Sequence, residues 1–140
     1  MLSVEKKLFV ETNNGTNCQI RPVTPEQPLR IGDKVIVRLT IRTDREMNYV
    51  FLKDLRAGCF EPADQLSGPE SRDGIWYYRS PKDVSENFFI NRLPEGTFVL
   101  EYPVYVSRSG EYAGGISTIQ CMYAPEFVSH TAGESLRIMP

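Results

Sequence analysis

One stretch, Leu93–Phe127, decides the fold of this chain and reads LPEGTFVLEYPVYVSRSGEYAGGISTIQCMYAPEF. Its residues alternate between two faces from Phe98 onward, a period of two that predicts a β-strand with one face on a core. Turns at Leu93–Gly96 and Ser107–Gly110 flank this strand, and a second strand is expected from about Ile116 to Met122. The expected core set is Phe98, Leu100, Tyr102, Val104 and Val106, and the opposite set is Val99, Glu101, Pro103, Tyr105 and Ser107.

Similar strand patterns occur along most of the chain. Asn13-Asn14-Gly15 is a strong turn signal, which predicts a hairpin between strands at Val4–Thr12 and Asn17–Arg21. Lys34–Arg42 has the cleanest alternation. Met47–Leu55 is the next expected strand, and its run Tyr49–Leu52 is apolar on both faces, as expected of a strand buried on both faces. With a last short strand at Ser135–Met139, we expect seven to nine strands and no helix. The predicted fold is an all-β, antiparallel, immunoglobulin-like sandwich, with a barrel as the alternative.

The segment Arg56–Asn87 differs from the rest because polar and turn-forming residues surround one apolar island, Ile75–Tyr78. We interpret it as a long loop with one short strand, a kind of loop that is usually functional or ordered by a neighbour.

The length of 140 residues is that of a single domain, 1–140. Residues 29–139 form its main body. Residues 1–28 are interpreted as its N-terminal hairpin and extended connection, with a tail from a preceding domain as the alternative.

Charge and hydropathy exclude several classes of partner. The formal net charge is −2 and no basic run exceeds Lys6-Lys7, which argues against nucleic-acid binding. No apolar run is long enough for a transmembrane segment. The N-terminus lacks a signal peptide, as expected of a cytoplasmic protein or of an internal piece of an exported one.

Three cysteines, Cys18, Cys59 and Cys121, lie far apart and form no Cys-x-x-Cys pair, which excludes a zinc ribbon. They are read as ordinary thiols, with one disulfide and one leftover thiol as the alternative. We expect no metal and no cofactor.

No set of residues forms a catalytic motif, so we expect no enzyme activity and no catalytic residue. His130 lies in a polar segment with no nucleophile signature near it, and is expected at the surface. The acidic residues lie mostly at turns or on outward strand positions such as Glu101. Asp54 follows an apolar strand and is expected to be a buried, hydrogen-bonded acid. Gly114-Gly115 precedes a strand rather than a helix, so a bulge or tight turn is favoured over a phosphate loop.

Trp76, Tyr77 and Tyr78 form a possible aromatic surface. Exposed aromatic residues can stack on sugar rings, which gives a free-standing carbohydrate- or ligand-binding module as an alternative function. They can equally cover the edge of a sandwich or contact a neighbouring domain.

Several short segments follow one another in an order that is typical of one known family. They are Ile31–Val37, Asp44–Val50, Asp54–Pro62, Asp83, Phe88-Phe89, Leu93–Thr97, Glu101-Tyr102, Ser109–Tyr112 and Met122–Phe127. This ordered set resembles the C-terminal macroglobulin-like domain of bacterial alpha-2-macroglobulins, and the resemblance covers roughly residues 29–139.

The resemblance implies an antiparallel sandwich within a large exported protease-trapping protein. Such a parent is expected in the periplasm or elsewhere outside the cytoplasm, as a lipid-anchored envelope protein. Its expected partners are the thioester-bearing helical domain of the same chain and the proteases that the parent traps. By the same analogy, the residues expected to contact the neighbouring domain are Met122, Tyr123, Pro125, Glu126 and Phe127.

The chain differs from a whole protein of that family. It has no Cys-x-x-Gln thioester motif, since Arg21, Pro62 and Ala124 lie three positions after the cysteines. It also has no helical domain and no bait region. The domain by itself is therefore expected to be a non-enzymatic structural and docking unit.

Overall fold

The computed structural model contains fourteen strands and no helix among the residues that it describes. The all-β antiparallel class predicted from the sequence is confirmed, and the strands are more numerous than the seven to nine expected. The described residues are 2–14, 17–23, 28–62, 68–72, 75–81, 85–113, 115–124, 128–131 and 135–139.

One layer of the sandwich is a five-stranded sheet in the order β2-β1-β4-β10-β6. The side chains of Val35, Val37, Leu39 and Ile41 are buried, as are those of Leu100, Tyr102, Val104 and Val106 on the neighbouring strand, so the predicted alternation of both strands is confirmed. The strands are β1 (Leu2–Asn14), β2 (Asn17–Pro22), β4 (Lys34–Thr43), β6 (Phe60–Pro62) and β10 (Gly96–Val106).

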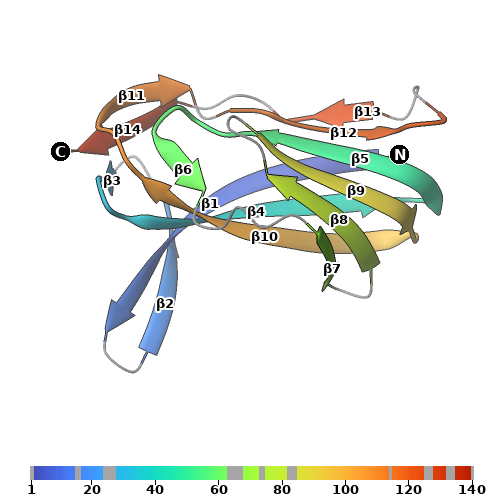
Figure 1. Ribbon diagram of the computed structural model, residues 1–140, viewed down its shortest axis with the longest axis horizontal. Helices are drawn as coiled ribbons and strands as arrows, with labels where there is room; N and C mark the ends of the chain where they lie inside the picture. The colour runs from blue at the N-terminus through green and yellow to red at the C-terminus, as the bar shows by residue number, and fades with distance from the viewer. Residues whose placement is uncertain are drawn as a thin grey trace.

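The second layer is a six-stranded sheet in the order β13-β12-β5-β9-β8-β7, and the core lies between the two layers (Figure 1). Its strands are β5 (Met47–Leu55), β7 (Gly68–Arg72), β8 (Ile75–Pro81), β9 (Ser85–Leu93), β12 (Ser117–Cys121) and β13 (Val128–His130).

A small third sheet lies at one end of the sandwich, near the C-terminus (Figure 1). It consists of β3 (Leu29–Arg30), β11 (Gly110–Ala113) and β14 (Ser135–Met139). The pair β14–β3 is parallel, in contrast to every other pairing among the described strands.

The hairpin β1–β2 projects from the body of the sandwich (Figure 1). Strand β1 pairs with β4 from Leu2 to Glu11 and with β2 from Phe9 to Asn14. Its first part therefore belongs to the sheet, whereas its last residues pair with β2 alone.

The interpretation of Arg56–Asn87 as a long loop with one strand is wrong. Strands β6, β7 and β8 and the start of β9 lie in it, and β8 pairs with both β7 and β9. The reason is that charged side chains occupy inward positions: Arg79 and Glu86 are buried together with Tyr77 and Phe88. An apolar pattern cannot show a strand whose inward positions are partly filled by paired charges.

The expectation that the run Tyr49–Leu52 is buried on both faces is also wrong. Val50, Leu52 and Asp54 point into the core, but Tyr49 is exposed and Phe51 is half-buried on the outer face of the sheet. Aromatic residues on this outer face made the strand look two-sided in the sequence.

Gly115 is required where the chain enters β12. Its φ is +67°, and a Cβ atom at this position would lie 2.0 Å from the Leu55 carbonyl oxygen. The backbone there is fixed, because Leu55 N–H donates to the Ile116 carbonyl at 2.9 Å. Gly114 lies outside the described residues, so the tight turn or bulge expected at Gly114-Gly115 stays a prediction.

We predict that Gly115→Ala lowers the free energy of unfolding by about 3 kcal/mol or more, because a backbone clash adds to the left-handed strain. Gly32→Ala is the matched control: its φ is +92° but no atom lies within 4 Å of an added Cβ, so about 1 kcal/mol is expected. Urea denaturation measures both losses, and equal losses would show that the clash relaxes without cost.

The thiols of Cys59 and Cys121 are buried and unbridged. Burial raises the pKa of Cys59 from 9.0 to about 11. Because both of these thiols are free, the alternative of one disulfide within the chain is wrong; the side chain of Cys18 lies outside the described residues.

A consequence is expected at alkaline pH. Between pH 9 and 11 the folded protein keeps the Cys59 proton that the unfolded chain has lost, so the free energy of unfolding falls as the pH rises. For a shift of this size the fall is about 2 to 3 kcal/mol. Urea denaturation at pH 8, 9.5 and 11 should show a shallower fall for Cys59→Ala than for the unchanged protein, and parallel curves would contradict this assignment.

Candidate docking surface

Met122 and Tyr123 form an exposed tip at the end of β12. They are the central residues of a turn that the Ala124 N–H closes on the Cys121 carbonyl at 3.3 Å. The Met122 side chain is 55% exposed and that of Tyr123 is 80% exposed. The turn therefore presents two large apolar side chains to solvent, and both lie among the residues expected to contact a neighbouring domain.

A third side chain, Tyr49 on β5, completes this tip. The Tyr49 carbonyl accepts the Met122 N–H at 2.8 Å. The Tyr49 and Tyr123 rings meet edge to face, with their centroids 5.1 Å apart and their planes at 84°. We refer to Tyr49, Met122 and Tyr123 as the tip. The other three residues expected in this contact, Pro125, Glu126 and Phe127, lie outside the described residues.

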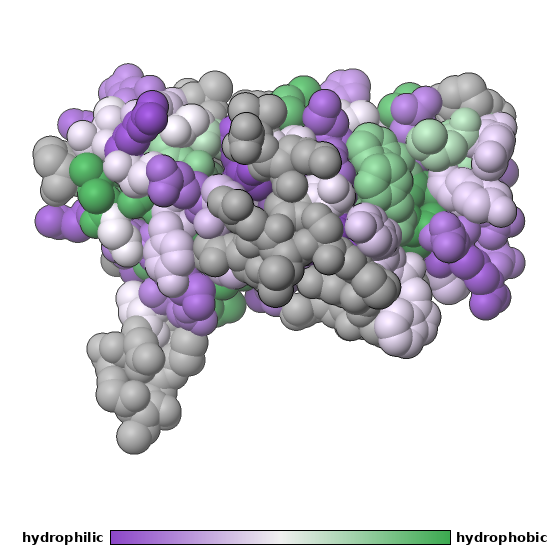
Figure 2. Space-filling model, in the orientation of Figure 1, coloured by the Kyte–Doolittle hydropathy of each residue, from purple (hydrophilic) through white to green (hydrophobic). Residues whose placement is uncertain are grey.

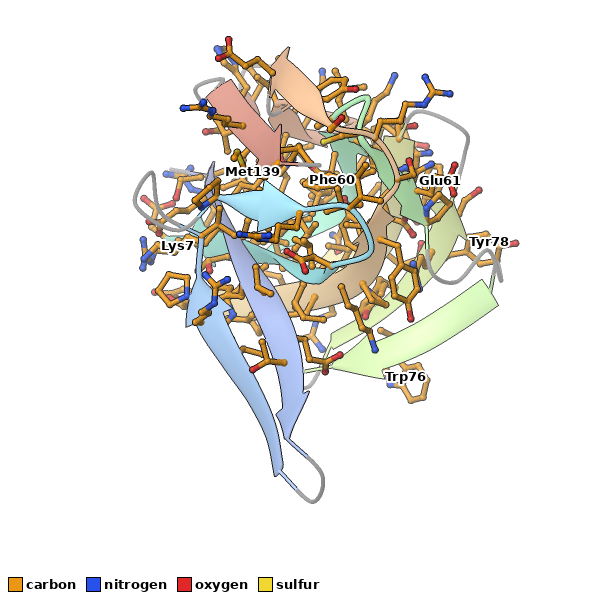
Figure 3. All side chains as sticks on the ribbon, turned by 90° about the vertical axis from the view of Figure 1, so that its left-hand side faces the viewer. Lys7, Phe60, Glu61, Trp76, Tyr78 and Met139 are labelled. Carbon is orange, nitrogen blue, oxygen red and sulfur yellow. The ribbon has the colours of Figure 1, made fainter. Side chains whose placement is uncertain are left out.

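The structure separates the three residues of the possible aromatic surface. Trp76 is 70% exposed and Tyr78 is also exposed, and both point away from the ribbon (Figure 3). Tyr77 is buried and packs its ring against Phe88 at a centroid distance of 5.7 Å. Strand β8 alternates, so only Trp76 and Tyr78 can belong to an aromatic surface.

Strand register places further aromatic residues beside Tyr78. Tyr78 pairs with Phe89 on β9, and Phe89 pairs with Phe51 on β5. The ring centroids are 6.5 Å apart for Tyr78 and Phe89 and 4.8 Å apart for Phe89 and Phe51. These residues and Trp76 form the aromatic face of the six-stranded sheet.

The aromatic face and the tip lie on the same side of the molecule. Tyr49 and Phe51 are two positions apart on β5, so both point outward from the same face of the sheet. Figure 2 shows green side chains beside pale ones over β5 and β9, and tyrosine and tryptophan are pale on this hydropathy scale. The two surfaces that the sequence suggested separately are thus neighbours.

A charged cluster lies on the inner face of the same sheet. Asp54 is completely buried and accepts hydrogen bonds from Lys6 Nζ at 2.7 Å, from Ser117 Oγ at 2.6 Å and from the Tyr102 hydroxyl. Burial, followed by the negative charge of Asp54, raises the pKa of Tyr102 well above its ordinary value, so this hydroxyl stays a donor. The expectation of a buried, hydrogen-bonded acid at Asp54 is confirmed.

Glu86 is the second acid of this cluster and pairs directly with Asp54 across β5 and β9. It accepts from Arg56 Nη1 at 2.8 Å and from Arg79 Nε. Burial raises the pKa of Glu86 above its ordinary value, while the hydrogen bond from Arg79 and the charges of both arginines act against that rise. Two acids side by side need neighbouring cations, and Lys6, Arg56 and Arg79 supply them.

His130 is exposed on β13, as expected of a surface histidine, and it lines a cleft of about 680 Å³ together with Thr131 and residues of β1. The Thr131 hydroxyl accepts the Ser117 N–H at 2.9 Å, which is a structural contact. Among the described residues, no three His, Cys, Asp or Glu side chains are placed to hold a metal ion. Nor does any described segment form a helix long and apolar enough to cross a membrane.

Comparison with known proteins identifies the family. Residues 2–126 match the sequence model described as Bacterial Alpha-2-macroglobulin MG10 domain. The chain belongs to the bacterial alpha-2-macroglobulin MG10 domain family. The resemblance drawn from the sequence motifs is therefore confirmed.

Solved structures share the fold of this MG10 domain. Salmonella alpha-2-macroglobulin reacted with methylamine is 21% identical, with a TM-score of 0.75 over 99% of this chain and 9% of that one. Trypsin-activated alpha-2-macroglobulin from Escherichia coli is 17% identical, also with a TM-score of 0.75, over 99% of this chain and 10% of that one. The native E. coli protein from domain MG7 to the C-terminus is 16% identical, with a TM-score of 0.73, over 99% of this chain and 23% of that one.

A eukaryotic protein also matches the MG10 chain in sequence. Circularly permutated Ras protein 2 of Dictyostelium discoideum is 28% identical over 109 residues, which are 78% of this chain and 3% of that protein. The MG10 chain spans about a tenth of the length of the whole alpha-2-macroglobulins above and far less of this protein.

Sequence reasoning missed residues of the tip, of the aromatic face and of the charged cluster. Tyr49, Phe51 and Phe89 were taken as ordinary strand residues, although their outward register positions could have placed them with Trp76 and Tyr78. Glu86, Arg56 and Arg79 were missed because their segment was read as a loop. Their signal was the opposite charge of Arg79 and Glu86 at positions in phase with Tyr77 and Phe88.

We predict that Glu86→Gln lowers the free energy of unfolding by about 3 to 5 kcal/mol, because it leaves two buried guanidinium groups without their anion. Glu101→Gln is the matched control. Glu101 accepts from Arg38 at 2.6 Å, but both side chains are partly exposed, so about 1 kcal/mol or less is expected. Both losses are measured by urea denaturation at neutral pH, and similar losses would show that the buried charges contribute nothing beyond a surface pair.

Proposed function

We propose that this chain is a non-enzymatic docking domain of a large bacterial alpha-2-macroglobulin-like protein that traps proteases outside the cytoplasm. Its partner is another domain of the same polypeptide, by analogy the thioester-bearing helical domain. The parent reaches proteases through its other domains. Membership of the MG10 family and the small share of the related chains that this fold covers support a role as one part of a longer protein.

One observation carries the docking role: the tip holds Tyr123 and Met122 in solvent although both are large and apolar. Burying such side chains against a partner is favourable, by about 1.5 to 3 kcal/mol for each fully buried apolar side chain. Tyrosine and methionine are also enriched at the cores of protein interfaces. The turn that presents them is held by backbone hydrogen bonds to β5 and within itself, so its shape is set before any partner arrives.

Methionine oxidation tests this docking. In the isolated chain, hydroxyl-radical footprinting should oxidise Met122 readily, because its thioether is exposed. In the complete parent polypeptide, the rate at Met122 should fall roughly tenfold, and Tyr123→Gly in the parent should restore much of the exposed rate.

Met47 is the internal standard, because it is buried inside the domain and should react slowly in both proteins. Tyr105→Gly is the matched variant, since Tyr105 is an exposed tyrosine on β10 in the other sheet and should leave the Met122 rate unchanged. Equal Met122 rates in the isolated chain and the parent would overturn the docking role.

A second candidate function is carbohydrate binding on the aromatic face. The observation in its favour is the row of Tyr78, Phe89 and Phe51 beside Trp76, since stacked rings on a flat sheet suit the faces of sugar rings. Binding on a glycan array that is lost in Trp76→Ala would support it. An absence of binding at high micromolar concentrations would exclude it and would leave docking as the role of this face.

A further inference from the structure

We propose that Tyr49 is the positioning residue of the tip: its ring supports Tyr123, and its left-handed backbone is kept in order to place that ring. This inference rests on the proposed docking function for its purpose, but its structural content concerns the chain alone. Two independent observations, one on the backbone and one on the contacts, lead to it.

The first observation is the backbone of Tyr49. Its φ of +59° is the one positive value among the described residues other than glycine. This region is unfavourable for a bulky side chain and is routinely adopted by glycine. A tyrosine in this conformation within a strand needs a reason.

The backbone of Tyr49 changes the phase of β5. Toward one end of the strand Val50, Leu52 and Asp54 are buried, and toward the other end Met47 is buried instead of Asn48. Strand β9 changes in the same way, because Ile90 and Leu93 are buried while the two residues between them are exposed. The β5–β9 ladder joins Asn48 to Arg92 and Val50 to Ile90 and is interrupted between these pairs, at Tyr49 and Asn91. This interruption accompanies the change of phase by which Met47 and Leu93 fill the core.

Glycine would produce this change of phase without strain, so the backbone alone does not explain a tyrosine. The second observation supplies the reason. The Tyr49 ring is 52% exposed and meets the Tyr123 ring edge to face, and its carbonyl accepts the Met122 N–H. The Cys121 thiol adds a contact at 3.4 Å to the Asn48 carbonyl. All these contacts join β5 to the turn that carries Tyr123.

The backbone and the ring of Tyr49 therefore have separate roles. The backbone sets the course of the strand at a cost in conformational energy, and the ring fixes the direction of its neighbour. Backbone strain kept at a position that supports an exposed surface is a known feature of functional sites.

The backbone part is tested by comparing glycine with alanine at this position in the 140-residue chain. Both variants remove the ring, and glycine alone removes the strain. The unfolding equilibrium constant of Tyr49→Gly should be roughly threefold to tenfold lower than that of Tyr49→Ala.

Tyr105 provides the matched control, because it is a strand tyrosine with 44% exposure and no positive φ. There the order should reverse, with Tyr105→Gly unfolding roughly twofold to fivefold more readily than Tyr105→Ala. The same order at both positions would overturn the assignment of strain at Tyr49.

The positioning part is tested by NMR order parameters of the turn from Met122 to Ala124. Tyr49→Gly should lower them although it relieves strain, whereas Tyr49→Phe, which keeps ring and backbone, should leave them unchanged. If Tyr49 had only a structural role, a variant that raises the free energy of unfolding would not lower the order parameters of the turn. Unchanged order parameters in Tyr49→Gly would overturn the proposal.

These outcomes can be told apart from a failure of the docking function. Both measurements use the isolated chain and no partner. Loss of protection at Met122 in the parent tests docking, whereas the glycine–alanine order and the turn dynamics test Tyr49. The tip can therefore prove to be positioned by Tyr49 even if the aromatic face, rather than the tip, contacts the partner.

Discussion

The two layers of this sandwich are joined by an interaction that is unusual for an apolar core, the set of hydrogen bonds around Asp54. Asp54 and Ser117 come from the six-stranded sheet, while Lys6 and Tyr102 come from the five-stranded sheet. Apolar contacts are not directional, so they allow one sheet to shift slightly against the other. Hydrogen bonds from three donors to one carboxylate are directional and are satisfied in only one relative position of the sheets. The relative position of the layers is thus tied to a few polar atoms.

The buried charge of Asp54 also constrains which side chains the neighbouring strands carry. Because Asp54 pairs directly with Glu86, the second acid has to be balanced by Arg56 and Arg79 within the same layer. The Arg79 guanidinium further lies 5.7 Å from the centroid of the Tyr102 ring, which links the two acids through one aromatic residue. Strand β5 is therefore fixed firmly at the end that carries Asp54, and its other end carries the left-handed Tyr49. One strand combines a rigid inner anchor with an outer surface that can meet a partner.

The sequence was sufficient where a strand obeys one simple period. The alternation in β4 and β10 is plain because their inward positions are almost all aliphatic or aromatic. Asp54 could be recognised as buried because it follows an apolar run. The prediction failed at Arg79 and Glu86, where charged side chains occupy inward positions of the strands. Each residue alone indicates a solvent-exposed position, and only the two opposite charges together indicate a buried one. The tip could be anticipated at Met122 and Tyr123 from a family resemblance. The role of Tyr49 could not be predicted, because the apolar residues Tyr49 and Phe51 on the outer face hide the change of phase in this strand.

The small parallel pair β3–β14 has a consequence for how the domain forms. Ile138 pairs with Leu29, so the two strands are brought together from nearly opposite ends of the chain. Most strands of the large sheets also pair with partners that are distant in sequence, such as β1 with β4 and β4 with β10. Folding that depends on such non-local pairings is slow, because the entropy of closing long loops is lost before the contacts form. During synthesis, β3 therefore remains without its β14 partner until β14 has left the ribosome.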